Sequence, residues 1–583
     1  MTLATPPTPS AALPVAAAPD RASAAPARSA QDRALLVLCW LVMLGLIGAP
    51  LVYVVVASIS VDPIEPAAGF TARALQEAFG RASQWWLLAK SMAFSLVIGV
   101  LSTVVAAGFA WTTVRLSMRG TRIREVLILG ALFVPSFVTA VAWVWLGTPE
   151  TGLINKTLGS LGVPGWLHVN VLSIWGMIFI LVTHHVPYAY LFISASMRRI
   201  DSRMEEASLM CGRGSLYTTL RVSMPLLRAS ILSSMLFIAI LSIGEFSVPQ
   251  ILGQQGAFRP LSVTIYRALY GEFQDYAYAA AVAVELMLVS LIGLYLYSRT
   301  VRNGERFVSV TGRGLQHSVS RPTRRTASLV WAVTVVYGMV AFLVPLAAMV
   351  LMALSAYLPP SLSDISLSFS YLWDALNTPG VRQATLNTLE LAVVVPIVCI
   401  AIALVVVYLS DRVKIRGAAA LSYLATAPLA VPGLVMGTGL LLFLIRTPFY
   451  GTLAIIGVGM VAICVTHAIR LVSNGLKQID PSLEEASRMC GVSGLATVRK
   501  IVMPLIRPSL FSAFVLIFVL TLRELTVAVV LYSPNTQVLS VVAWNYSTSA
   551  LNRACAVGLL QLVIMLVSVP ILRAVFRLKR GES

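Results

Sequence analysis

A duplicated polar segment constrains the fold of this chain more than any other feature of its sequence. Residues 200–228 recur as residues 479–507, and 15 of the 29 aligned positions are identical without a gap. Both copies lie between long apolar runs. Each carries Glu-Ala-Ser, a glycine six residues after that glutamate, and Met-Pro twelve residues after the glycine. A repeat of this kind indicates that the chain consists of two similar halves that present the same structural device.

The composition is that of a membrane protein. Of the 583 residues, 58% are hydrophobic and only 11% are charged, whereas soluble proteins carry about a quarter charged residues. Twelve apolar runs are long enough to cross a bilayer, because a helix rises about 1.5 Å per residue through about 30 Å of hydrocarbon. The expected spans are 34–58, 87–113, 126–147, 169–195, 226–252, 275–298, 328–356, 386–410, 418–445, 452–473, 508–532 and 554–575. We therefore expect an all-α integral membrane fold of twelve transmembrane helices.

The basic residues predict how these spans are oriented. Lys and Arg gather in alternate connections and in the C-terminal tail, whereas the connections 61–80, 148–168, 358–380 and 533–550 contain few of them. Cytoplasmic connections carry the excess of Lys and Arg, so we expect both termini and both copies of the repeat on the cytoplasmic side of a membrane. A resemblance described below implies that this is a bacterial inner membrane. The net charge of +19 then belongs to a membrane face, and nucleic-acid binding is not expected.

The repeat extends beyond the polar segment and predicts the division of the chain. Val134-Pro135 matches Val431-Pro432, and each half holds six spans. An even number of spans keeps the two halves parallel. We expect a disordered cytoplasmic tail over 1–32, a first six-span repeat over 33–300, a cytoplasmic linker over 301–327 and a second six-span repeat over 328–583.

Local signals in each polar segment predict a helix, a break and a second helix. An aspartate begins each segment as an N-cap, and a pair of glutamates in the first turn suits the helix dipole. A glycine ends the first helix in the left-handed conformation, and a proline precedes the next apolar run. We name residues 200–228 the first elbow and residues 479–507 the second elbow.

The elbows resemble the EAA motif of permeases in ATP-binding-cassette (ABC) importers. Each has Glu-Ala-Ser, three residues, Gly, nine residues, Val or Ile, two residues and Pro, with serine in place of the motif's second alanine. The resemblance covers residues 34–575 and implies the type I, MetI-like importer fold. It implies that each elbow docks on a separate ATPase subunit. The coupling residues it implies are Glu205, Glu206, Ala207, Gly212, Pro225, Glu484, Glu485, Ala486, Gly491 and Pro504.

The resemblance also implies partners. Two elbows imply two copies of an ABC ATPase subunit, and the family uses a periplasmic substrate-binding protein in addition to the lipid bilayer. A P-loop requires Gly-Lys before Ser or Thr, and none of the six lysines follows a glycine. We therefore expect no ATPase activity in this chain, no cofactor and no metal site.

Two carboxylates inside expected spans are candidates for the translocation path. Glu245 and Glu524 lie at equivalent positions of the two halves. Inserting a charged group into a bilayer costs free energy, so such groups usually have a structural or functional role. One interpretation is that both line the route and attract a cation, and the alternative is an interhelical salt bridge or hydrogen bond.

The substrate is the least constrained part of the prediction. The segments 244–253 and 522–547 are similar to those of ferric iron permeases, which favours ferric iron. Thiamine, polyamine and 2-aminoethylphosphonate permeases have the same architecture and remain alternatives. An ion-coupled secondary transporter with parallel six-span halves is the alternative from a different class.

Overall fold

The computed structural model describes residues 30–200, 203–253, 258–304, 321–357, 366–413, 417–429, 431–492 and 494–575. Every extended element within these ranges is a helix, apart from two isolated β-bridges, which confirms the all-α prediction. Most of the expected tail over 1–32 and of the expected linker over 301–327 lies outside the described residues. The helices flanking that linker reach Gly304 and begin again at Arg324.

Nine helices in the described part of the chain are long and apolar enough to cross a membrane, and three bent helix pairs raise the number to twelve if each pair is one span. The continuous helices are Arg33–Ser58, Ala82–Val114, Ile174–Met197, Thr219–Ile243, Tyr276–Arg302, Arg324–Ala353, Pro379–Val413, Leu453–Leu476 and Leu551–Leu572. Each of the twelve expected spans overlaps one of these helices or pairs.

The third and ninth expected spans are broken at equivalent prolines. In the first half, α5 (Thr121–Leu129) and the 3-10 turn after it meet α6 (Ser136–Gly147) at 92°, and in the second half α19 (Ala418–Thr426) meets α20 (Gly433–Leu444) at 110°. Pro135 and Pro432 precede the second segment with ψ near 140°. Proline has no N–H to continue the preceding helix, so the chain turns there.

Two expected spans were predicted too long as single helices. Instead of one helix over 226–252, α11 (Met224–Ile243) stops and α12 (Ser247–Leu252) begins. Instead of one helix over 508–532, α25 (Arg507–Arg523) is followed by α26 (Ala528–Leu531). Each interruption contains one of the two candidate carboxylates, Glu245 or Glu524.

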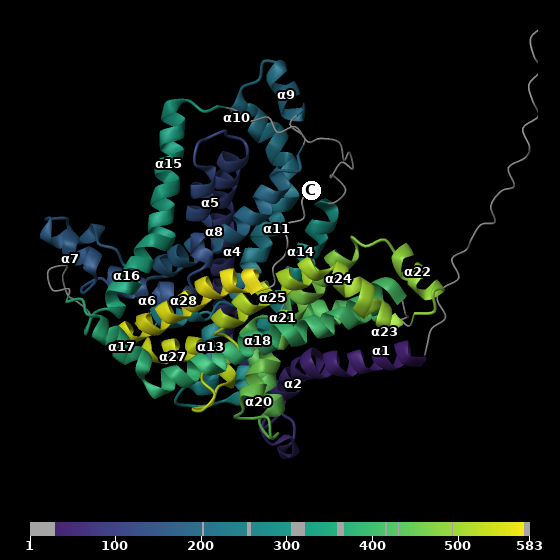
Figure 1. Ribbon diagram of the computed structural model, residues 1–583. Coiled ribbons are helices and arrows are strands. Elements are labelled where there is room, and N and C mark those ends of the chain that lie inside the picture. Colours follow the sequence, from purple (N-terminus) through teal and green to yellow (C-terminus); the bar gives the residue numbers. More distant parts are fainter. Residues whose placement is uncertain are drawn as a thin grey trace, which may run out of the picture.

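The first span of each half packs on the opposite half as well as on its own. In the N-terminal half, α1 (Ala30–Met43) contacts α19 and α2 (Ala49–Ser58) contacts α20. In the C-terminal half, α15 (Arg324–Gly338) contacts α5 and α16 (Val344–Ala353) contacts α6. Figure 1 shows both exchanges, with α15 beside α5 and α2 beside α20. The two halves are therefore interlocked.

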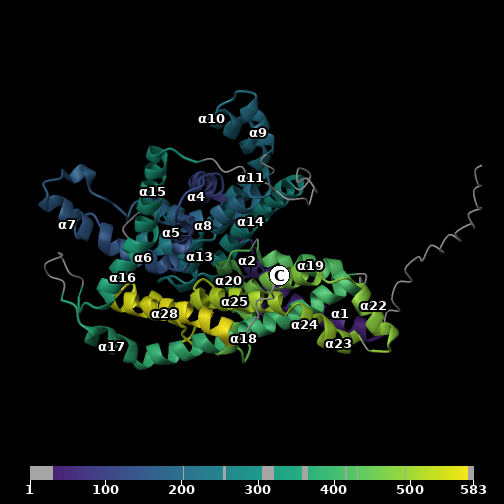
Figure 2. The same cartoon turned by 45° about the horizontal axis from the view of Figure 1, so that its top comes forward.

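The helices of the two halves run in different directions, and the elbows project from separate ends. In Figure 1, α5, α8 (Ile174–Met197) and α15 stand upright, whereas α18 (Pro379–Val407), α21 (Leu453–Leu476) and α28 (Leu551–Val575) lie across the view. The first elbow is at the top and the second at the right, and Figure 2 shows the same separation. The two elbows thus form separate surfaces.

Candidate functional site

Each elbow is a short helix, a left-handed glycine and a second short helix, as predicted. In the first elbow α9 (Arg203–Met210) leads to α10 (Ser215–Thr218), and in the second α22 (Ser482–Met489) leads to α23 (Gly494–Thr497). Gly212 has φ 73° and Gly491 has φ 76°. No atom lies within 4 Å of a Cβ built at either glycine. The glycines are therefore required for backbone conformation and not for close packing.

Backbone and side-chain hydrogen bonds close the helix ends. The N–H of Arg213 donates to the carbonyl of Ser208 (3.3 Å), and the N–H of Val492 donates to that of Ser487 (3.2 Å), which is the Schellman pattern. At the start of α22 the Asp480 carboxylate accepts from the N–H of Ser482 (2.9 Å), and this hydrogen bond lowers the pKa of Asp480. The equivalent Asp201 lies outside the described residues.

The first glutamate of each elbow is buried in an ion pair within the protein. Glu205 lies 3.0 Å from Arg115, at the end of α4 (Ala82–Val114), and Glu484 lies 2.9 Å from Arg412, in the π-helical turn after α18. The side chains are no more than 12% exposed. These pairs join each elbow to the second span of its own half. The sequence analysis did not identify these two arginines as partners of the elbows. The available signal was their separation of 297 residues, which equals that of the repeated residues Pro135 and Pro432.

A pair of hydroxyls holds the two helices of each elbow together. Ser208 and Thr218 are 2.9 Å apart in the first elbow, and Ser487 and Thr497 are 2.9 Å apart in the second. This contact explains why serine stands where the EAA motif has alanine, since alanine could not hydrogen-bond to the threonine. The two threonines were also missed, although both are repeated in the sequence.

The outer surface of both elbows carries the same exposed side chains. Glu206 and Glu485 are exposed, and Met210 and Met489 are each 89% exposed. Further exposed apolar side chains at equivalent positions are Met204 and Leu483. Flexible methionines suit an adaptable binding surface. Ala207 and Ala486 are exposed beside these glutamates.

The two elbow prolines act differently. Pro225 is the second residue of α11, and the helix runs on through it after a π-helical turn over Thr219–Ser223. Pro504 lies in α24 (Met503–Leu505), and the chain bends by 70° before α25. Directly after the second elbow stands an additional proline, Pro508, where the first half has Ala229. Pro508 cannot donate to the carbonyl of residue 504, which accounts for a bend in the second half alone.

The candidate translocation carboxylates stabilise the helix breaks that contain them. Glu245 Oε1 accepts from the N–H (3.2 Å) and the hydroxyl (2.5 Å) of Ser247. Glu524 Oε1 accepts from the N–H of Val527 (3.0 Å) and from the hydroxyl of Thr526. Each glutamate thus stabilises the turn that leads into the following short helix. One carboxylate oxygen of each is used in this way, and both side chains are half-buried.

Residues next to these glutamates contact the broken span of the opposite half. A Cβ at Gly244 would lie 2.8 Å from the Pro432 ring, so glycine allows a close approach there. At the equivalent position of the second half, Arg523 donates to the carbonyl of Leu132 (2.7 Å) and to the hydroxyl of Tyr188 (2.8 Å). At equivalent positions of this interface, the first half therefore has a glycine that allows close packing and the second half has an arginine that donates hydrogen bonds.

The described residues contain no group of three His, Cys, Asp or Glu side chains that could hold a metal ion. His184 and His185 are buried in α8, and His185 Nδ1 is 2.8 Å from the carbonyl of Leu181. Four cysteines are buried and two, Cys211 and Cys490, are exposed on the elbows.

Comparisons with known proteins agree with the repeat. The family model described as "Binding-protein-dependent transport system inner membrane component" matches twice, over residues 102–302 and 375–580. The ferric transport system permease protein FbpB of Actinobacillus pleuropneumoniae is 26% identical over 490 residues, which is 82% of this chain and 69% of that protein. The putative ferric transport system permease protein FbpB 1 of Haemophilus influenzae is 25% identical, covering 78% of this chain and 71% of its own length. The probable ABC transporter permease protein y4fN of Sinorhizobium fredii is 24% identical, over 86% and 88% respectively.

Proposed function

The chain belongs to the family of binding-protein-dependent transport system inner membrane components, and from this premise we propose that it is driven by two separate ATPase subunits that dock on its two elbows. The observation that carries the proposal is the repeated outer surface of the elbows. Glu206 with Met210, and Glu485 with Met489, offer one carboxylate and one apolar side chain to a partner in each half. The same surface twice in one chain fits two copies of the same partner.

The buried ion pairs supply the mechanical link from the partner to the membrane. Glu205 is attached to Arg115 at the end of the second span, and Glu484 is attached to Arg412 in the same place of the second half. A partner that moves an elbow therefore also moves a membrane-spanning helix. ATP-driven closure of the ATPase pair would draw the elbows together and open the opposite side of the interface, and hydrolysis would reset it.

The orientation follows from the same proposal. Both termini and both elbows face the cytoplasm of the inner membrane, and a periplasmic binding protein delivers the substrate at the opposite face. The excess of Lys and Arg in the connections on the elbow side supports this assignment. The chain itself hydrolyses no ATP, since it has no Gly-Lys pair for a P-loop.

We propose ferric iron as the substrate. The support is that two relatives covering most of the chain are named ferric transport permeases. Glu245 and Glu524 lie beside the interface between the halves, where they can act on a passing cation. Thiamine, a polyamine or 2-aminoethylphosphonate would use the same architecture, so uptake of labelled iron must be compared with uptake of these compounds.

The exposed elbow cysteines allow a direct test of docking. Cys211 and Cys490 are exposed, whereas Cys39, Cys399, Cys464 and Cys555 are buried. In inside-out vesicles a membrane-impermeant maleimide should label the two elbow cysteines, and the ATPase encoded beside this chain should protect both. The matched variant Glu206→Lys/Glu485→Lys should restore labelling in the presence of the ATPase. Iron uptake that runs on an ion gradient in vesicles without any ATPase would instead establish a secondary transporter.

A further inference from the structure

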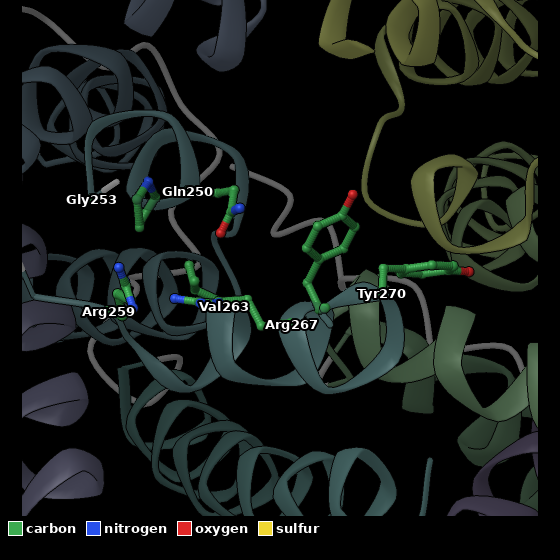
Figure 3. Close-up of a pocket in the computed structure, with 9 residues that line it drawn as sticks. Gln250, Gly253, Arg259, Val263, Arg267 and Tyr270 are labelled. Carbon is green, nitrogen blue, oxygen red and sulfur yellow. The ribbon is translucent and has the colours of Figure 1, made fainter. Parts of the chain in front are cut away.

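A cavity of about 310 Å³ lies between α12 and α13 (Leu261–Tyr270), in the connection that follows the fifth span. Its polar lining includes Gln250, Arg259, Tyr266, Arg267 and Tyr270. Figure 3 shows the Arg267 side chain extended along the cavity toward the side of Arg259, with Gln250 on the opposite wall. Both arginines are exposed, so a solute can reach the cavity.

Two arginines give the described lining of the cavity a positive charge. Neither the Arg259 nor the Arg267 side chain forms an ion pair or hydrogen bond with the described residues, and no carboxylate lines the cavity. The nearby Asp275 forms an ion pair with Arg73, whose Nη2 lies 3.3 Å from Asp275 Oδ2. Two guanidinium groups on one small cavity can together hold an anion, because their planar forks match carboxylate and phosphate oxygens.

The second half shows that the fold does not require this charge. Ser262 donates to the carbonyl of Glu245 (2.7 Å), and Ser540 donates to that of Glu524 (2.6 Å), which aligns the two segments at an offset of 278 residues. At this offset Arg259 corresponds to Gln537, and Arg267 to Asn545. The same helices thus form in the second half with neutral side chains at both positions.

One wall of the cavity is also part of the interface between the halves. The Tyr270 hydroxyl donates to the carbonyl of Val530 in α26, and Figure 3 shows this side chain pointing away from the arginines. The Tyr266 ring lies 6.2 Å from Trp544, and Phe246 lies 5.1 Å from the same ring. A ligand in the cavity therefore touches the helix that contacts the opposite half.

We propose that the Arg259–Arg267 cavity binds a small oxyanion, through a carboxylate or phosphoryl group, on the face where the substrate is delivered. The assignment of that face rests on the proposed function. The anion has two possible sources, an anionic ligand that accompanies the ferric ion or free phosphate from the periplasm. In either case Arg259 and Arg267 hold its oxygens and Gln250 donates a further hydrogen bond.

Binding measurements on the full chain, purified with its ATPase subunits, test the proposal. The probes are inorganic phosphate, citrate and ferric citrate, each followed by isothermal titration calorimetry. Arg259→Gln combined with Arg267→Asn copies the second half and should weaken binding of at least one probe by about 10- to 100-fold, because two charge-assisted contacts are lost. A preference for ferric citrate identifies an anion that travels with iron, and a preference for phosphate identifies free phosphate.

The control removes two arginines from other connections on the same face. Arg382 and Arg446 lie outside the cavity, so Arg382→Gln with Arg446→Gln lowers the charge equally and should leave binding unchanged. Equal binding by both double variants and the unmodified chain, or no binding of any probe, overturns the proposal. Retention of the ATPase subunits on the purified chain is measured in the same samples, so that loss of the complex is recognised as a failure of the proposed function and not of the anion site.

Discussion

The ion pair between Arg115 and Glu205 should decide whether the first elbow can bind its partner. Removal of the carboxylate by Glu205→Leu leaves the Arg115 side chain, only 6% exposed, with its guanidinium nitrogens unpaired among the described residues. Leaving one member of a buried ion pair uncompensated costs about 3–5 kcal/mol. The elbow can relieve this cost only by moving away, so that water reaches the arginine.

The expected loss of affinity follows from this free energy. Each 1.4 kcal/mol is a tenfold change in an equilibrium, so the affinity of the first elbow for its ATPase subunit should fall by about 100- to 4,000-fold. Glu484→Leu should cost less, about 1–3 kcal/mol, because Arg412 still donates to the carbonyls of Leu476 (2.8 Å) and Ile479 (2.7 Å). The two halves should therefore respond unequally to the same substitution.

The assay is a titration of the purified ATPase subunit onto tagged permease in detergent. Arg115→Met with Glu205→Leu removes both charges, and replacing a buried pair by apolar groups of similar volume is often neutral. The double variant should therefore regain most of the affinity that Glu205→Leu loses. If the single and double variants bind the ATPase equally well, or equally poorly, the ion pair does not position the elbow.

Three further predictions concern the breaks in the chain. Gly212→Ala and Gly491→Ala should each destabilise an elbow by about 1–2 kcal/mol, because alanine is strained in the left-handed conformation. Asparagine at the same sites should destabilise the elbows less. Protection of the elbow cysteines from maleimide by the ATPase measures the effect of the alanine and the asparagine variants. Arg523→Met removes two hydrogen bonds between the halves. It should raise the ATPase rate measured without binding protein by at least about tenfold, since each charged hydrogen bond contributes about 1.5–3 kcal/mol. An unchanged basal rate argues against a closing role. Glu245→Gln with Glu524→Gln should reduce iron uptake at limiting substrate while leaving the chain in the membrane, and unchanged uptake removes these residues from the translocation path.

The elbows could be predicted closely because their signals are local and occur twice. Glu-Ala-Ser and the glycine six residues after its glutamate define the helix and its end without any knowledge of the surroundings. The sequence could not show which glutamate of each pair faces inward. That depends on Arg115 and Arg412, which reach the elbows from helices far away in the chain, and periodicity within one elbow carries no information on them.

The predicted number of spans agrees with the described helices if each bent pair is one span, but the shapes of the spans were not predicted. A hydropathy window registers apolar residues whether the helix is straight or bent by 92°, so the breaks at Pro135 and Pro432 did not change the count. The ends of α11 and α25 were not predicted for a related reason, since Glu245 and Glu524 were interpreted as charges within a span and not as acceptors of hydrogen bonds in a turn. The Arg259–Arg267 cavity was also missed, because its charge is absent from the second half and no repeat draws attention to it.

The exchange of first spans between the halves has a consequence for biosynthesis. The helices α1 and α2 leave the ribosome first, but α19 and α20, on which they pack, follow several hundred residues later. At about 5–20 residues per second that interval lasts from about twenty seconds to more than a minute. During this interval α1 and α2 lie in the membrane without their contacts to α19 and α20. A gene split between the halves should therefore give two fragments that are degraded when made separately and are rescued when made together.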